Sequence, residues 1–145
     1  MIETMLVYII LLKTKLVSFH NFSEYIDNCF LNSGDNRLLL DLEFWNCNIN
    51  EINDIVNDYI FHEKIIPDYS ILGSILIEKL KGKYNENKLN IEEFGSSTYK
   101  VWQLLPDQIS MTEPFITLCY ADDCLSYGDA SRTRELYEKA FSYQW

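Results

Sequence analysis

Apolar residues recur at helical spacing along most of the chain. The clearest stripe follows Asn48, with apolar side chains at i, i+3, i+4, i+7 and i+8. Its members are Ile52, Ile55, Val56, Tyr59 and Ile60. Polar residues fill the opposite side, which is typical of a helix with one face buried. Asn48 and Glu51 also have the spacing of a capping box, which predicts that the helix starts at Asn48.

The N-terminal third predicts three more helices. The apolar run 5–12 is far shorter than the ~20 residues that cross a membrane, and no basic residue precedes it as in a signal peptide, so we expect a buried first helix. Asn21 and Glu24 repeat the capping spacing, which makes Phe22 the expected first residue of a second helix. The dense apolar stretch 35–45 indicates a third.

The rest of the chain predicts three amphipathic helices. The first follows Pro67 and is expected to stop at Gly82, since glycine is a frequent C-terminal cap. The second starts at Pro114, and the third is expected to have Ser131 as its capping residue after a turn at Gly128. The side chains expected to face inward are Leu72, Ile75, Leu76, Leu80, Phe115, Leu118, Cys119, Leu136, Tyr137, Ala140 and Phe141.

The segment 98–105 permits two interpretations. It is rich in residues that favour strands, and it could pair with 115–119 as a short hairpin within 98–119. It could equally form a short helix capped by Ser97 or Thr98 and ended before Pro106. A lone strand would have no partner, so we favour the helix.

Composition fits one all-α domain. The 145 residues are 48% hydrophobic, which suits a single compact multi-helix domain over 1–145 with its own core. Five glycines and three prolines are too few to punctuate many short strands. The four scattered cysteines, Cys29, Cys47, Cys119 and Cys124, form no Cys-x-x-Cys pair and favour free thiols in a reducing cytoplasm.

The net charge narrows the class of partner. With 22 acidic and 12 basic residues the formal charge is −10. Proteins that bind nucleic acid directly, or anionic membrane surfaces, present basic faces, so neither partner is expected. A basic protein partner suits this charge.

No motif for catalysis or for a cofactor is present. The chain has two histidines and lacks the signatures of nucleophilic hydrolases, dinucleotide binding, phosphate-binding loops and zinc proteases. Asp122 and Asp123 precede Asp129, but adjacent helical residues point about 100° apart and the alternating calcium pattern is missing. We therefore expect no metal site, no cofactor and no enzymatic activity. A large polar pocket holding a carboxylate of raised pKa would instead indicate an enzyme.

The acidic residues are concentrated in two blocks without lysine or arginine, 38–63 and 101–131. One interpretation is that they are solvated helix faces that maintain solubility. The sharper one is that they flank a single surface for a cationic partner. The acids predicted to steer that partner are Glu51, Asp54, Asp58, Asp122, Asp123 and Asp129.

Aromatic residues lie inside the same blocks. Trp45 and Tyr59 belong to the first, and Tyr120 and Tyr127 to the second. Tyr59 is on the apolar stripe and is expected in the core. Tyr120 and Tyr127 are the predicted interface anchors, because buried aromatics contribute much of the binding energy in protein interfaces while charges steer association.

These features together resemble bacterial toxin-immunity proteins of contact-dependent inhibition, polymorphic toxin and nuclease bacteriocin systems. The resemblance is one of type: a small acidic chain with acid blocks, dispersed aromatics and no catalytic motif. Its local features are the stretches 120–137 and 22–26. The resemblance implies a cytoplasmic antitoxin that binds a delivered toxin domain, often a nuclease, and blocks its active site or its access to substrate.

Charge suggests how such an inhibitor would act. A nuclease toxin is basic where it holds nucleic acid, so an acidic inhibitor could imitate the phosphate backbone or fill the same groove. An alternative of another class is an adaptor or scaffold domain that binds a peptide or a subunit in a groove between helices. Neutral or acidic ligands would favour that alternative.

Overall fold

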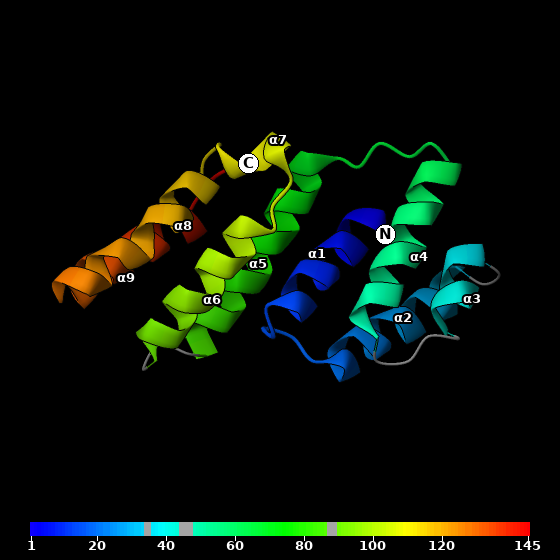
Figure 1. The fold of residues 1–145 in the computed structure, drawn as a ribbon, viewed down its shortest axis with the longest axis horizontal. Coiled ribbons are helices and arrows are strands. Elements are labelled where there is room, and N and C mark those ends of the chain that lie inside the picture. The colour runs from blue at the N-terminus through cyan, green and yellow to red at the C-terminus, as the bar shows by residue number, and fades with distance from the viewer. Residues whose placement is uncertain (34–35, 44–47, 87–89) are drawn as a thin grey trace. The chain divides into compact units, whose positions relative to one another are not determined.

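The computed structural model describes residues 1–33, 36–43, 48–86 and 90–145, and every regular element among them is a helix (Figure 1). The predicted all-α class is therefore confirmed. The chain divides into two compact units, unit 1 (Met1–Asp68) and unit 2 (Tyr69–Trp145). Each unit has its own set of packed helices, and the expectation of a single domain over 1–145 stays a prediction.

Unit 1 is built around its apolar first helix. Its elements are α1 (Ile2–Lys13), α2 (Phe19–Ser33), α3 (Arg37–Glu43) and α4 (Ile49–His62). Helix α1 packs against α4, α4 against α3, and α3 against α2. The core comprises Ile2, Met5, Tyr8, Ile9, Leu12, Phe22, Ile26, Leu38, Leu39, Leu42, Ile52 and Val56. The predicted buried helix at the N-terminus and the predicted stripe of α4 are both confirmed.

Capping side chains fix where the helices of unit 1 begin. Asn48 accepts hydrogen bonds from the backbone N–H groups of Asn50 and Glu51, so its predicted role is confirmed. The predicted start of α2 at Phe22 is wrong. Ser18 Oγ accepts from the N–H of Asn21 (3.2 Å) and Asn21 Oδ1 accepts from the N–H of Ser18 (3.1 Å). Asn21 is thus the third-position partner of a capping box opened by Ser18.

The predicted helix over 35–45 corresponds to α3, which covers Arg37–Glu43. Residues 35, 44 and 45 lie outside the described residues, and so does Cys47. The interpretation of Trp45 as an aromatic of the first acidic block therefore stays a prediction. Tyr59 is partly buried against the core of unit 1, as predicted.

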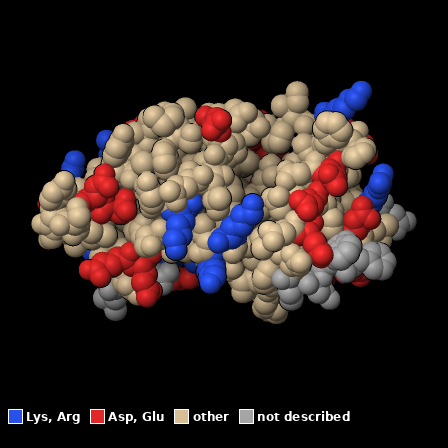
Figure 2. Space-filling model, in the orientation of Figure 1, with Lys and Arg blue, Asp and Glu red and all other residues tan. Residues whose placement is uncertain are grey.

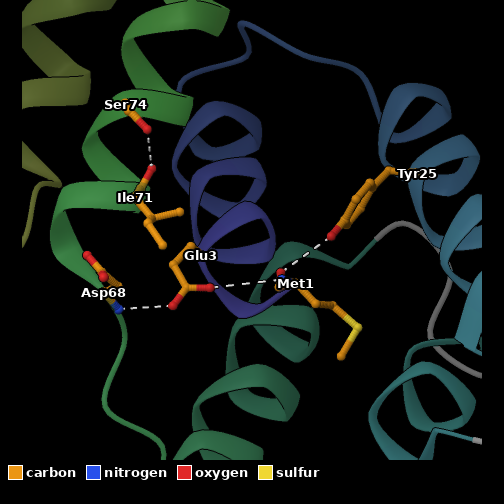
Figure 3. A network of polar contacts seen from close by, with 6 residues as sticks. All are labelled: Met1, Glu3, Tyr25, Asp68, Ile71 and Ser74. Carbon is orange, nitrogen blue, oxygen red and sulfur yellow. Dashed lines mark hydrogen bonds and ion pairs between the residues drawn. The ribbon is translucent and has the colours of Figure 1, made fainter. Parts of the chain in front are cut away.

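The carboxylate of Glu3 ties the first turn of α1 to the end of unit 1 (Figure 3). Glu3 Oε1 accepts a hydrogen bond from the backbone N–H of Asp68 (2.9 Å). Nearby, the hydroxyl of Tyr25 on α2 donates to the carbonyl of Met1 (3.3 Å). Bonds to a charged acceptor are stronger than neutral ones, and an acid in the first turn also favours the helix dipole. These bonds hold the start of α1 from two directions.

The described residues of unit 2 form five helices and a 3₁₀ turn, which pack around an aromatic cluster. The elements are α5 (Tyr69–Glu86), α6 (Ile91–Gln103), α7 (Asp107–Ser110), α8 (Phe115–Ala121), η1 (Asp122–Tyr127) and α9 (Ala130–Phe141). Helix α9 packs on α8, α5 and η1, while α6 packs on α8 and η1. Phe94 and Tyr137 meet edge to face at 5.0 Å between ring centroids, with Tyr84 at 5.4 Å from Phe94. Aromatic pairs of this geometry stabilise a core beyond their buried area.

Helices cover most of the segment 98–119, as favoured from the sequence, with turns at 104–106 and 111–114, and the alternative of a hairpin is excluded because the segment contains no strand. Its helix begins at Ile91 and not at the expected caps Ser97 or Thr98, because Asn90 accepts from the N–H of Glu93. Thr98 instead lies inside α6, where its hydroxyl bonds back to the carbonyl of Phe94 at 3.0 Å. The strand-favouring residues of this segment are therefore accommodated in a helix by packing.

Two predicted helix ends in unit 2 are wrong. Helix α5 continues through Gly82 to Glu86, whereas Gly128 takes the left-handed conformation (φ 75°) that glycine favours. The cap of α9 is Asp129 and not Ser131, since Asp129 Oδ1 accepts from the N–H of Arg132 (2.9 Å). Glycine and short polar residues were correctly recognised as boundary signals, but the chain uses only some of them.

Gly82 gives a direct test of the helical register of α5. It lies in the helix interior, and nothing is within 4 Å of a Cβ built there. We expect Gly82→Ala to raise the free energy of unfolding by about 0.5–1 kcal/mol, because alanine loses less backbone entropy on entering a helix. Urea unfolding would show a higher midpoint with an unchanged slope. A lower midpoint would contradict the continuous helix.

Candidate functional site

The predicted partner-binding residues fall into two groups, one in each unit. The first group lies on α4 of unit 1 and comprises Glu51, Asp54 and Asp58. The second lies in unit 2 and comprises Tyr120, Asp122, Asp123, Tyr127 and Asp129, which run from α8 through η1 to the cap of α9. The structure thus brings together the members of each group. A single surface shared by both groups stays a prediction.

The acids of α4 share one face of that helix. Their spacing of three and four residues places them in consecutive turns, and Figure 2 shows acidic side chains gathered over α3 and α4. Asp58 borders a small pocket of about 110 Å³ that Arg37, Tyr59 and His62 also line. Ion pairs between described residues involve none of Glu51, Asp54 and Asp58. Their charges are therefore not neutralised by a described lysine or arginine.

Exposed tyrosines flank the acidic pair of η1. Tyr120 is 57% exposed and Tyr127 is 87% exposed, although aromatic side chains of this size are usually at least partly covered. Asp123 between them is also exposed. Asp129 has a structural role that the sequence did not reveal, because its carboxylate caps α9. Steering by Asp129 stays a prediction, and any variant there must preserve the cap.

Asp122 differs from its neighbour because it is partly withdrawn from water. Its Oδ1 atom is buried and has no hydrogen-bond partner among the described residues. Burial raises the pKa of the Asp122 carboxyl above its ordinary value, and the negative charge of Asp123 adds to the rise. The pair therefore joins one exposed acid to one acid whose ionisation is disfavoured by its surroundings.

The position of Asp122 depends on a close contact between η1 and α6 at Gly95. A Cβ built on Gly95 would lie 3.1 Å from Asp122 Cβ and 3.1 Å from Leu125 Cδ1. Such distances are shorter than ordinary carbon contacts, so a Cβ at this position would fit only if Asp122 or Leu125 moved slightly. Gly95 thus lets η1 lie against the backbone of α6.

A buried hydroxyl pair fixes α9 beside the same contact. Thr98 Oγ1 and Tyr137 Oη lie 2.9 Å apart in the core of unit 2. Burial raises the pKa of the Tyr137 hydroxyl, and the charge of Asp122 contributes to the rise. Thr133 Oγ1 on α9 also donates to the carbonyl of Ala121 at 2.6 Å, next to the start of η1. Buried polar groups that are satisfied in this way specify how the helices pack.

An open groove of about 500 Å³ runs between α6 and η1. Its lining residues are Glu92, Ser96, Tyr99, Lys100, Gln103, Asp122, Leu125 and Ser126. Only Asp122 was among the predicted site residues. The five residues from α6 have the spacing of one helix face, which was visible in the sequence. That this face borders η1 was not visible, because the contact at Gly95 is a tertiary feature.

The described residues contain no group of three or more histidine, cysteine or acidic side chains placed to hold a metal ion. Cys29, Cys119 and Cys124 are free thiols, and burial raises the pKa of Cys119. A separate finding concerns membranes: within the described ranges, no helix is long and apolar enough to cross one.

Comparison with known proteins adds no relative, since no family model, no curated protein and no solved structure matches the chain. The resemblance to toxin-immunity proteins therefore stays a prediction. Function has to be inferred from the groove, the acidic pair and the exposed tyrosines themselves.

The contact at Gly95 can be tested against the open position Gly82. Gly95→Ala gains the same helix propensity, but its methyl group must displace Asp122 or Leu125 by a few tenths of an ångström. Overpacking costs about 1–3 kcal/mol, so we expect a net loss of stability of up to about 2 kcal/mol. Urea unfolding of both alanine variants measures the difference. An equal gain at the two glycines would contradict the close approach.

The environment of Asp122 predicts a pH-dependent stability. Because its pKa is raised in the folded protein, the folded state holds the proton more tightly than the unfolded chain does. Stability therefore falls as pH rises through the interval from the unfolded pKa to the folded one. We expect Asp122→Asn to unfold at a higher temperature than the wild type at pH 7.

The advantage of Asp122→Asn should shrink as pH falls below the ordinary aspartate pKa of about 3.9, where both states are protonated. Thermal unfolding between pH 3 and pH 7 measures this dependence, and Asp54→Asn on the exposed face of α4 is the control. A lower unfolding temperature for Asp122→Asn at pH 7 would show that the carboxylate has a stabilising partner.

Proposed function

We propose that the chain is an immunity protein that binds and neutralises a basic toxin domain of the nuclease type, acting in the cytoplasm. The observation that carries this proposal is the η1 region, where the acidic pair Asp122–Asp123 follows the exposed Tyr120 in the chain and precedes the exposed Tyr127. Acids beside exposed aromatics combine the two chemistries that a protein interface uses for steering and for anchoring.

The overall charge supports the same proposal. A chain of formal charge −10 attracts a basic partner over a range of about one Debye length, ~8 Å at physiological salt. No ion pair between described residues involves Asp122 or Asp123, and the exposed carboxylate of Asp123 is available to a partner. A stable inhibitor interface needs about 800 Å² from each protein.

Inhibition would follow from competition for the same charges. A nuclease holds the phosphate backbone with lysines and arginines, and carboxylates on an inhibitor present negative charge to those side chains. Occupying them would exclude nucleic acid from the toxin. Electrostatic attraction would also make association fast and sensitive to salt.

The groove gives weaker support to a second candidate function, that of an enzyme. A polar pocket with a carboxylate of raised pKa is the feature that would indicate an enzyme, and the α6–η1 groove holds Asp122. The groove is open to solvent, however, whereas active sites exclude water around the reacting groups.

An adaptor that binds a subunit in the groove would accept neutral or acidic ligands. The acids of the groove favour a basic ligand.

The experiment pairs the chain with the product of the gene immediately upstream of its own. Expression of that product alone should arrest bacterial growth, and co-expression of the chain should restore it. We expect Tyr127→Ala to weaken binding about 30-fold, the equivalent of ~2 kcal/mol for an aromatic anchor. Asp123→Lys should mainly slow association and reduce its dependence on salt. Surface plasmon resonance at several salt concentrations separates the two effects.

Matched control variants distinguish the loss of a specific contact from a general loss of charge or of folding. Asp27→Asn removes a charge at an exposed position of α2 in unit 1, and Leu31→Ala truncates a side chain that is 85% exposed on the same helix. Full protection by Asp123→Lys with salt-independent affinity would reject the acidic-surface mechanism. Failure of the chain to bind or to neutralise the upstream product would reject the immunity function.

A further inference from the structure

The groove between α6 and η1 carries an excess of negative charge. Glu92 and Asp122 line it, and Lys100 is the basic residue among its lining side chains. The groove is a cavity of about 500 Å³, which is roomy enough for the side chain of a long residue. Its charge therefore suits a cationic side chain.

Asp122 is the lining residue whose carboxylate has a buried oxygen without a hydrogen-bond partner among the described residues. That oxygen is Oδ1, and the carboxylate is partly removed from water. Burial disfavours the ionised form of Asp122, and a cation bound in the groove beside its carboxylate would offset that cost.

An aromatic platform borders the same groove. Tyr99 lines it and stacks on Trp102 with ring centroids 6.1 Å apart and planes inclined by 22°. A guanidinium group stacks on aromatic faces, and its planar fork has five N–H donors. Ser96, Gln103 and Ser126 supply oxygen acceptors around the rim. An ammonium group has fewer donors and no planar face, so the arrangement favours arginine over lysine.

We propose that the α6–η1 groove binds the guanidinium group of an arginine from the basic protein partner, with Asp122 as its counter-charge and Tyr99 as its stacking surface. This inference rests on the proposed function and names the chemistry by which the partner is held. The proposed site also predicts that Lys100 weakens the binding of arginine. A cation at the rim repels the incoming guanidinium, so its removal should strengthen binding.

The test uses a neutral isostere of arginine as its reference. The probe is the peptide acetyl-Ala-Arg-Ala-amide, titrated into the ¹⁵N-labelled full chain and followed by amide chemical shifts. The reference peptide has citrulline in place of arginine, which keeps the shape and removes the charge. We expect saturable shifts at Ser96, Tyr99 and Ser126 with the arginine peptide, and binding at least about fivefold weaker with the citrulline peptide.

Variants assign the effect to the groove. Asp122→Asn should weaken the arginine peptide about fivefold or more, whereas Lys100→Gln should strengthen it about twofold. Ser96→Phe fills the groove from an exposed position of α6 without altering Asp122, and should abolish the shifts. Asp27→Asn, at an exposed position of α2 in unit 1, is the matched charge control and should leave the affinity unchanged. Preserved amide dispersion confirms that each variant is folded.

Several outcomes would overturn the inference. These are an absence of saturable groove shifts at peptide concentrations of about 10 mM, equal affinity for the citrulline peptide, or unchanged binding by Asp122→Asn or Ser96→Phe. The titration contains no toxin, so its outcome is independent of the proposed function. Groove binding without neutralisation of the upstream product would reject the immunity function alone. Neutralisation without groove binding would reject the arginine site alone.

Discussion

The close approach of η1 to α6 at Gly95 is the constraint on which the rest of unit 2 depends. A side chain at this position would displace Asp122 or Leu125 by a few tenths of an ångström, because both have atoms 3.1 Å from the place of its Cβ. Glycine costs helix stability at an interior position, so the contact must offset that cost through packing. In return, η1 lies against α6, and the hydroxyl pair of Thr98 and Tyr137 connects the same region to α9 at 2.9 Å.

Because of this contact, the neighbouring acids Asp122 and Asp123 differ in their surroundings and in their proposed roles. Asp122 faces the groove in partly desolvated surroundings that raise its pKa, while Asp123 is exposed between Tyr120 and Tyr127. In the proposed complex, Asp123 steers the basic partner from a distance and Asp122 holds one of its arginines at close range. Steering acts on the rate of association, and a held cation acts on the rate of dissociation.

Sequence patterns predicted the helices far better than the site. The stripe of α4 follows from spacing alone, because helix period decides which side chains share a face, and the burial of α1 follows from its continuous apolar run. Helix ends were less predictable: Gly82, Gly95 and Gly128 look alike in sequence, yet only Gly128 takes a left-handed turn. The acidic blocks located Asp122 and Asp123, but the lining of α6 was missed. This face of α6 lines a groove only because α6 packs against η1 in the tertiary structure.

The account is tested most directly by proton distances across the Gly95 contact. In the free, ¹³C-labelled chain, a nuclear Overhauser spectrum should show cross-peaks from the Gly95 Hα protons to the Asp122 Hβ protons and to the Leu125 methyl groups. Those cross-peaks would establish that η1 lies on the backbone of α6 and that the groove exists in solution. Their absence, in a spectrum that still connects Thr98 with Tyr137, would contradict the account.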